Sequence, residues 1–169
     1  QAMSSTPKYS FYTTVTPDLC GKEPVMNPTA AFTLFQNAAG LHAEEIGNGT
    51  AALAEHNRYW VATHTRIDFH EHARLMEKIC VSTWAVRRKP NAVRGYRGYD
   101  IKSGGKLIAE GVTEWVVLDR ETGFVRFSQF GFPEDFEFYN ELPFGGKLTH
   151  YHDEFSDADE VYTVSLIHI

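Results

Sequence analysis

The sequence predicts an α+β fold in which an antiparallel β-sheet wraps around one long central helix. Two observations support this prediction: one helical segment is apolar around most of its circumference, and strand-like segments joined by short links follow it. A helix of that kind must be enclosed by other structure, and short links favour antiparallel neighbours. With 169 residues, the chain suffices for one domain but not for two ordinary ones.

The helix is expected over residues 28–46. Asn27 is a favourable N-cap, Pro28 suits the first helical position, and Gly47 ends the helix. Gly40 costs about 1 kcal/mol relative to alanine inside a helix, which suggests that another backbone packs closely there. The apolar surface consists of Phe32, Leu34, Phe35, Ala38, Ala39, Leu41, His42 and Ile46. The narrow polar strip consists of Thr33, Asn37, Gly40 and Glu44.

Five segments are rich in β-branched and aromatic residues, as strands are. They span residues 8–16, 58–69, 79–86, 93–101 and 107–119. The first precedes the helix and the other four follow it, and the stretch from Ser103 to Lys106 makes a good hairpin turn. A long twisted sheet that curls around one buried helix is the arrangement known as the hot-dog fold.

Both ends of the chain are expected to lie outside this domain, which then covers residues 8–129. Residues 1–7 are expected to be disordered, with the first two left over from cloning. From residue 130 onwards the chain holds nine acidic residues and only Lys147 as a basic one. Residues 130–160 are therefore interpreted as an acidic linker that crosses a surface. Residues 161–169 are expected to be the first strand of a second, missing hot-dog domain, left without a partner.

Composition excludes several classes of protein. No apolar run approaches the roughly 20 residues of a membrane span, and no signal peptide opens the chain. A uniformly basic face for nucleic acid is absent. The two cysteines, Cys20 and Cys80, cannot form a disulfide framework, and they lack the spacing of a zinc or redox site. A reduced cytoplasmic protein is therefore expected.

Several motifs stand in a particular order along the chain. Residues 35–42 read Phe-Gln-Asn-Ala-Ala-Gly-Leu-His, Thr83 and Trp84 lie in a strand, and residues 114–119 read Glu-Trp-Val-Val-Leu-Asp. Together they resemble the N-terminal hot-dog half of the fatty acyl-acyl-carrier-protein (acyl-ACP) thioesterases. That family has a similar Q-x-A-A-x-x-H helix, T-W strand and W-v-l-x-D strand. The resemblance covers residues 9–127.

The sequence departs from the family in two places. Residues 70–74 read His-Glu-His-Ala-Arg, where the family usually has Tyr-Pro or a similar pair. The family's catalytic motif, Asp-x-Asn-x-His-Val-Asn-Asn, lies in the second hot-dog half, after a strand like that at residues 161–167. This motif does not occur in the chain. No catalytic residue is therefore carried over from the family.

The resemblance implies a thioester hydrolase that releases free fatty acid in fatty acid biosynthesis, with this chain as its N-terminal, substrate-binding half. It implies no cofactor and no metal, and a location in the cytoplasm or in an organelle stroma. It also implies two partners: an acyl-carrier protein, and a second hot-dog domain in cis or in a homodimer.

Two other functions stay open. The chain can be a non-catalytic acyl-binding or pairing module, or an acyl-CoA thioesterase that acts as a single-hot-dog dimer. A hydroxyacyl-ACP dehydratase on the same fold is disfavoured, because no His-Phe-Pro-Gly-type loop occurs.

Asp18 is the candidate catalytic residue of the single-hot-dog alternative. In hot-dog thioesterases a carboxylate activates water or attacks the carbonyl, while backbone N–H groups at the helix N-terminus hold the oxyanion. Asp18 precedes the helix, where single-domain hot-dog thioesterases resemble each other in carrying such an acid. The other interpretation is that Asp18 only caps a turn.

Five residues are candidates for binding the substrate. Gln36, at the edge of the apolar helix face, is expected to contact either the substrate and its pantetheine arm or a strand backbone. His42 lies on that face and is expected to be a hydrogen-bonded histidine of the core or cavity lining. Trp60, Trp84 and Trp115 are expected to belong to the core, to the lining of an acyl cavity, or to both.

Arg87, Arg88 and Lys89 are the candidate docking site for the acyl-carrier protein. Acyl-carrier proteins are acidic, so an acidic enzyme needs a local positive surface to bind one. Arg94 and Arg97 lie three residues apart on the next strand, so they point to opposite faces and only one can join the patch. The other interpretation is an ordinary solvated hairpin tip.

Overall fold

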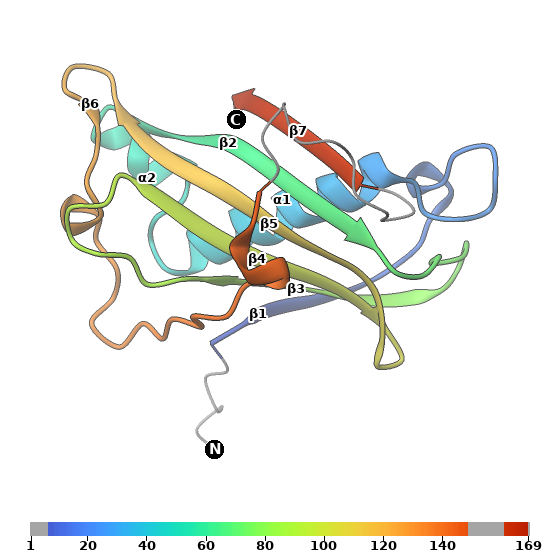
Figure 1. Cartoon of the computed structure of the whole chain (residues 1–169). Coiled ribbons are helices and arrows are strands. Elements are labelled where there is room, and N and C mark those ends of the chain that lie inside the picture. Colours follow the sequence, from blue (N-terminus) through green and yellow to red (C-terminus); the bar gives the residue numbers. More distant parts are fainter. Residues whose placement is uncertain (1–6, 149–160, 169) are drawn as a thin grey trace.

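The protein is described here by a computed structural model that covers residues 7–148 and, for the backbone alone, residues 161–168 (Figure 1). The described helices are α1 (Pro28–Glu45) and α2 (Thr50–Glu55), with short 3₁₀ turns at Pro17–Leu19, Phe127–Gln129 and Pro143–Gly146. The described strands are β1 (Tyr9–Thr14), β2 (Arg58–Phe69), β3 (Lys78–Ala85), β4 (Arg94–Ser103), β5 (Lys106–Asp119), β6 (Gly123–Phe124) and β7 (Val161–His168).

The strands form one antiparallel sheet in the order β1-β3-β4-β5-β2-β7, and β6 pairs with the end of β5. Figure 1 shows this sheet curling around α1, so the predicted hot-dog fold is confirmed. The predicted hairpin turn joins β4 to β5. Gly104 and Gly105 have φ angles of 54° and 82° there, a region that glycine enters without steric cost.

The sheet departs from the prediction that short links join neighbouring strands. Residues 70–77 link β2 to β3, yet these strands are three places apart, because β2 pairs with β5. An eight-residue link can span up to roughly 26 Å, whereas three strand spacings amount to only about 14 Å. The link is therefore long enough to join strands that are not neighbours. Its length alone could not predict that β2 pairs with β5 rather than with β3.

β7 pairs antiparallel with β2, from Val61↔His168 to Asp68↔Val161. The expectation that this final strand lacks a partner is therefore wrong. Without β7, one edge of β2 would present unpaired backbone N–H and C=O groups, and this pairing satisfies them. The first six residues and the last part of the linker, residues 149–160, lie outside the described part of the chain, and so do the expectations made for them.

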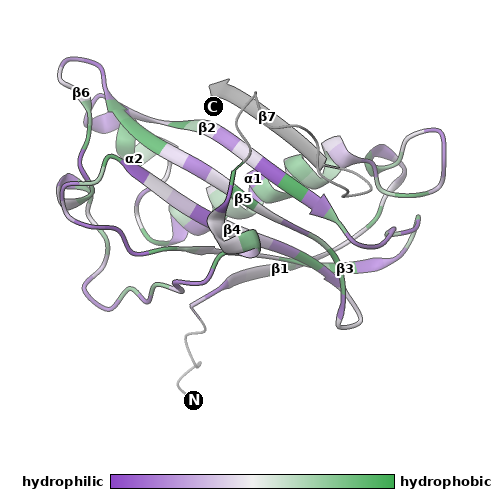
Figure 2. Ribbon diagram, viewed as in Figure 1, coloured by the Kyte–Doolittle hydropathy of each residue, from purple (hydrophilic) through white to green (hydrophobic). Residues whose placement is uncertain are grey.

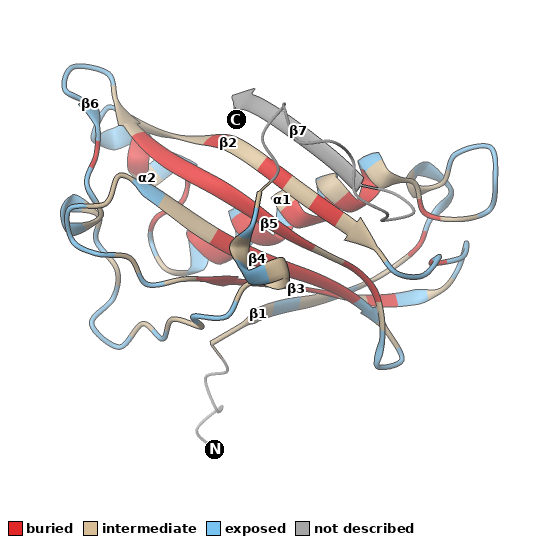
Figure 3. Ribbon diagram, viewed as in Figure 1, coloured by how far each residue is buried: buried red, intermediate tan, exposed pale blue. Residues whose placement is uncertain are grey.

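α1 begins as predicted: the side-chain oxygen of Asn27 accepts a hydrogen bond from the backbone N–H of Ala30 at 2.7 Å. The helix packs its apolar side into the sheet, where Phe35 stacks on Tyr99 of β4 with ring centroids 4.8 Å apart. Figures 2 and 3 show that α1 and β5 carry apolar, buried residues. The buried residues of α1 are Ala30, Ala31, Leu34, Phe35, Ala38, Ala39, His42 and Ala43.

Two details of the helix differ from the predictions. Leu41 is 49% exposed, so it belongs to the exposed strip rather than to the apolar face. A methyl group added at Gly40 would meet no described atom within 4 Å, so the close backbone approach expected there is absent from the described residues. The close approach occurs instead at Gly111 on β5, where a Cβ would lie 2.8 Å from Cε2 of Phe35.

The acidic segment from residue 133 to residue 147 passes around the end of β3 onto the outer face of the sheet. Phe136 lies on the helix side beside His42, and the backbone N–H of Tyr139 donates to the carbonyl of Ala85 at 3.1 Å. Farther on, the guanidinium of Arg66 lies 4.1 Å from the ring centroid of Phe144. This part of the predicted linker therefore crosses a surface of the domain.

Candidate functional site

A cavity of about 250 Å³ lies between the second half of α1 and the sheet. Its walls come from α1, from the beginning of β4 and from the end of β5, and residues 125–132 close it from one side. Most of the lining is apolar, with Ala39 and Ala43 on the helix and Val117 on β5. The small side chains of α1 leave space that a larger residue would fill, so the cavity follows directly from the alanine-rich helix.

Trp60 and Trp115, two of the five predicted substrate-binding residues, line this cavity. Their rings pack edge to face, with centroids 5.8 Å apart. Each indole N–H already has a partner: that of Trp60 donates to the carbonyl of Asn48 at 2.9 Å, and that of Trp115 donates to the hydroxyl of Tyr99 at 3.3 Å. Because these polar atoms are satisfied, both residues add apolar surface to the site.

An aromatic strap, defined as residues 127–138, covers one side of the cavity. Phe130 packs on Trp60 with centroids 4.9 Å apart, and Phe132 lies 5.0 Å from both Phe136 and Phe138. The phenylalanines that line the cavity are Phe127, Phe130 and Phe132. Sequence reasoning treated most of this stretch as linker, although the five phenylalanines between residues 127 and 138 are a signal that could have identified it.

His42, near the C-terminal end of α1, and Arg97 of β4 form a buried polar pair. Nη1 of Arg97 donates to Nδ1 of His42 at 2.8 Å and to Oγ1 of Thr83 at 3.3 Å. Because Nδ1 accepts, the imidazole is neutral and carries its proton on Nε2. Burial, together with the nearby charge of Arg97, lowers the pKa of His42 to about 3. His42, also packed against Tyr9, is thus the hydrogen-bonded core histidine that the sequence suggested.

Arg97 is 9% exposed and lines the cavity, but no carboxylate of residues 7–148 forms an ion pair with it. The guanidinium stays charged near neutral pH, although burial lowers its pKa below the usual value. Burying such a charge without a counterion costs several kcal/mol. Sequence reasoning correctly placed Arg94 and Arg97 on opposite faces, but it did not identify Arg97 as a residue of the site.

Gln36 lies on the cavity wall formed by α1. Both polar atoms of its side chain are buried and have no hydrogen-bond partner among the described residues. A buried, unsatisfied amide is unfavourable by about 1–3 kcal/mol, so these atoms are available to a ligand. The alternative role suggested for Gln36, a hydrogen bond to a strand backbone, is not present in the described part of the chain.

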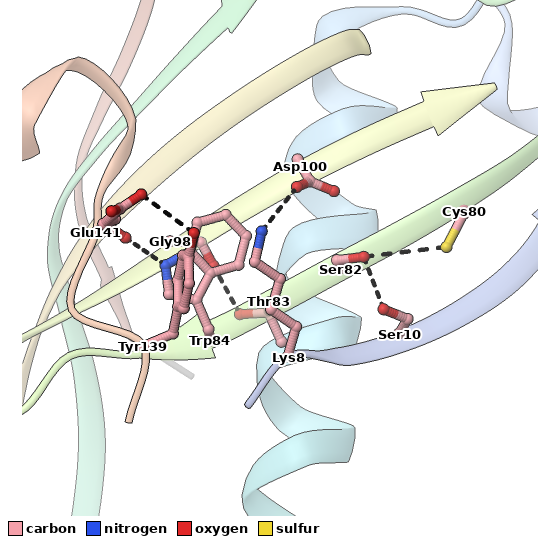
Figure 4. A network of polar contacts seen from close by, with 10 residues as sticks. All are labelled: Lys8, Ser10, Cys80, Ser82, Thr83, Trp84, Gly98, Asp100, Tyr139 and Glu141. Atoms are coloured by element: carbon pink, nitrogen blue, oxygen red, sulfur yellow. Dashed lines mark hydrogen bonds and ion pairs between the residues drawn. The ribbon is translucent and has the colours of Figure 1, made fainter. Parts of the chain in front are cut away.

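Trp84 does not line the cavity, because it lies on the outer face of the sheet (Figure 4). Its indole N–H donates to the carbonyl of Glu141 at 2.6 Å, and Lys8 sits 4.1 Å from its ring centroid. Strand alternation explains this position: Thr83 faces the helix, so the next side chain faces away. In the structure Trp84 holds the chain around residue 141 against the sheet.

Asp18 lies in the 3₁₀ turn before α1 and is exposed, away from the cavity lining. It accepts a hydrogen bond from the hydroxyl of Thr16 at 2.5 Å. The backbone N–H of Asn27, at the N-cap of α1, donates to the carbonyl of Leu19 and keeps this turn near the start of the helix. Asp18 therefore sits beside the beginning of α1, whereas the cavity lies beside its second half.

The three basic residues Arg87, Arg88 and Lys89 lie in the loop between β3 and β4, between residues that line the cavity. Arg87 packs 4.4 Å from the ring centroid of Phe138, and Arg88 packs 4.8 Å from that of Tyr96. These contacts hold the charges in place beside the aromatic strap. Lys89 is exposed.

A curled antiparallel sheet around one helix, with an apolar cavity beside that helix, defines a hot-dog protein. A sequence model of the acyl-ACP thioesterase N-terminal domain matches residues 18–126. The chain therefore belongs to the acyl-ACP thioesterase family. A search of curated proteins finds no match. No helix among the described residues is long and apolar enough to cross a membrane.

Solved structures of thioesterases share the fold. An acyl-ACP thioesterase from Bacteroides thetaiotaomicron is 20% identical with a TM-score of 0.70, and the match covers 81% of this chain and 55% of that one. The 12:0-ACP thioesterase from Umbellularia californica is 14% identical with a TM-score of 0.62, over 72% and 50%. A DHNA-CoA thioesterase from Staphylococcus aureus is 18% identical with a TM-score of 0.64, over 72% and 82%. The chain thus spans about half the length of these two acyl-ACP thioesterases.

Proposed function

We propose that this chain is the N-terminal, substrate-binding half of an acyl-ACP thioesterase that releases free fatty acid in fatty acid biosynthesis. The observation that carries the proposal is the apolar cavity between α1 and the sheet, with Trp60 and Trp115 in its walls. In a family whose substrates are acyl thioesters, an apolar cavity of this kind suits the hydrocarbon chain of the acyl group. Such an enzyme acts in the cytoplasm or in the stroma of an organelle.

Hydrolysis itself requires groups that this cavity does not supply. The described residues that line it include no carboxylate, and the family's Asp-x-Asn-x-His-Val-Asn-Asn motif does not occur in the sequence. We therefore assign catalysis to a second hot-dog domain that carries this motif. Residues 161–169 would be the first strand of that domain, since β7 extends the sheet beyond β2.

The acyl-carrier protein would dock on Arg87, Arg88 and Lys89. These charges stand beside the aromatic strap and the cavity rim, so a carrier bound there would have its acyl chain close to the cavity. Positive charges at a docking site mainly accelerate association with an acidic partner, and salt weakens that effect.

Filling the cavity tests the proposed acyl site. Ala39→Phe places a ring in the space that an acyl chain would occupy, so binding of octanol to the 169-residue chain should fall by at least about tenfold, measured by calorimetry. Ala51→Phe adds the same side chain at an exposed position of α2 and is the matched control. Unchanged octanol affinity in a folded Ala39→Phe variant would exclude the cavity as the acyl site.

A second candidate function is an acyl-CoA thioesterase built from a dimer of single hot-dog domains, with Asp18 as the catalytic carboxylate. The observation in its favour is the match to the DHNA-CoA thioesterase over 82% of that protein's length. Against it stands the distance along α1 that separates Asp18 from the cavity within one copy. A hydrolysis assay with an Asp18 variant separates the two functions and is described in the Discussion.

A further inference from the structure

Among residues 7–148, the positive charge of Arg97 has no counterion on its own side of the sheet. The two nearest acidic residues along the sheet are Asp100 on β4 and Glu114 on β5. Both lie on the outer face: Asp100 pairs with Lys8 at 3.7 Å, and Glu114 pairs with Arg94 at 3.6 Å. Strand alternation keeps these carboxylates away from Arg97, so the fold leaves a cation on the cavity side.

The partners that Arg97 does have cannot neutralise it. His42 and Thr83 accept hydrogen bonds from Nη1, but the imidazole is neutral and the hydroxyl carries no charge. A guanidinium has five N–H donors in a planar fork, which matches the two oxygens of a carboxylate. The charge and the donor geometry therefore both favour an anionic oxygen ligand.

Gln36 places a second polar group on the wall of the same cavity. Its amide has a donor and an acceptor that are buried and unpaired among the described residues. The rest of the lining is predominantly apolar, although Arg94 and Arg126 also contribute to it. A ligand that satisfies the whole cavity must therefore combine an aliphatic chain with a small oxygen-bearing anionic head.

We propose that the cavity binds a free fatty acid, with the carboxylate on Arg97, the hydrocarbon chain against the two tryptophans, and Gln36 as a further polar group of the lining. The proposal rests on the cavity being the acyl site, and it adds that the site distinguishes the charged product from neutral acyl compounds. A thioester carries no charge at its carbonyl, whereas its hydrolysis yields a carboxylate. The free acid would then compete with acyl-ACP for the cavity, which makes the enzyme subject to product inhibition.

The test compares three ligands of equal chain length with the 169-residue chain at pH 8, where a carboxylate is ionised. They are octanoate, methyl octanoate and octanol, and their affinities are measured by calorimetry. We expect octanoate to bind at least about tenfold more tightly than either neutral ligand, as a hydrogen bond to a charged group implies. Arg97→Gln should abolish this preference, and Gln36→Leu should weaken it, while octanol binding stays within about twofold.

Two further variants keep the test decisive if Arg97→Gln does not fold. Arg97→Lys retains the charge without the planar fork and should keep part of the preference for octanoate. Arg66→Gln removes an arginine on the outer face that is paired with Asp68 at 2.9 Å, and it should leave all three affinities unchanged.

The outcomes separate this proposal from the proposed function. Equal binding of octanoate and octanol would overturn the carboxylate site but leave the acyl cavity intact. Binding of methyl octanoate as tight as that of octanoate, lost equally in Arg97→Gln, would show that Arg97 recognises a neutral carbonyl and would also overturn it. Failure of all three ligands to bind would overturn the cavity itself as an acyl site.

Discussion

His42 shows how a single buried residue responds to its surroundings. It is 6% exposed, packs between Tyr9 and Phe136, and accepts a hydrogen bond from Arg97. Protonation would place a second positive charge beside that of Arg97 in a site with little water. Both burial and the charge of Arg97 therefore disfavour the imidazolium form, and the pKa of about 3 reflects this.

The lowered pKa of His42 predicts a pH dependence of stability. The unfolded chain takes up a proton near pH 6.5, whereas the folded chain does so only near pH 3, so stability is lost as the pH falls between these values. One proton corresponds to a slope of up to about 1.4 kcal/mol per pH unit. Urea unfolding from pH 7 to pH 4 should therefore show a shallower slope for His42→Gln than for the original sequence.

The control for this prediction is His70→Gln, which removes an exposed histidine at the end of β2. If the slope for His42→Gln equalled that of the original sequence, the imidazole would not be buried in its neutral form. A signal assigned to the His42 imidazole that shifts near pH 6 in the folded protein would lead to the same conclusion.

At the scale of secondary structure, α1 has two different sides. One side is packed into the sheet, and Phe35 comes so close to β5 that only glycine fits at position 111. The other side carries Gly40 and the half-exposed Leu41, with open space around the glycine. The two glycines therefore have opposite structural roles, although each lies inside a regular element.

This difference predicts opposite effects of alanine substitution. Gly40→Ala should raise the free energy of unfolding of the 169-residue chain by about 1 kcal/mol, because alanine is the better helix former and its methyl group meets no neighbour. Gly111→Ala should lower it by about 1–3 kcal/mol, because the methyl group collides with the ring of Phe35 and lies 3.1 Å from the carbonyl of Arg66. Urea denaturation measures both changes.

A loss of stability in Gly40→Ala would contradict the open space seen around this residue and would indicate that another surface packs there. Gly111→Ala acts as the opposite control in the same experiment. If that variant were as stable as the original chain, the close approach of Phe35 to β5 would be wrong.

At the scale of the whole molecule, the cavity lies apart from Asp18, the acidic residue that the sequence suggested for catalysis. Asp18 stands beside the beginning of α1, and the cavity stands beside its second half. Within one copy, Asp18 is therefore not among the described residues that line the cavity. The proposed second hot-dog domain resolves this separation, since it would bring catalytic groups from outside the described residues.

The 169-residue chain is therefore expected to hydrolyse octanoyl-ACP no faster than a blank without protein, and Asp18→Asn should change nothing. The Asp18→Asn protein should keep its octanol affinity, which shows that it is folded. Rapid turnover by the original chain that disappears in Asp18→Asn would support the single-hot-dog alternative instead. A chain extended through the family's Asp/Asn/His motif should hydrolyse the substrate, measured as release of free carrier thiol.

The sequence by itself was sufficient to predict the main helix, the long strands and the fold class. Asn27, Pro28 and Gly47 mark the limits of α1, and alternation in residues 58–69 and 107–119 defines two long strands, because caps and periodicity are local properties. The ordered motifs also pointed to the family that the match over residues 18–126 supports.

Only the tertiary structure decided which residues form the site. Trp84 and Trp115 look alike in the sequence, yet one faces the outer surface and the other faces the cavity. Arg97 gained its importance only once β4 placed it opposite His42, while Asp100 and Glu114 lie on the other face. Such assignments depend on which strands pair and which face the helix covers. These are contacts between residues far apart in the chain, and local patterns carry no information about them.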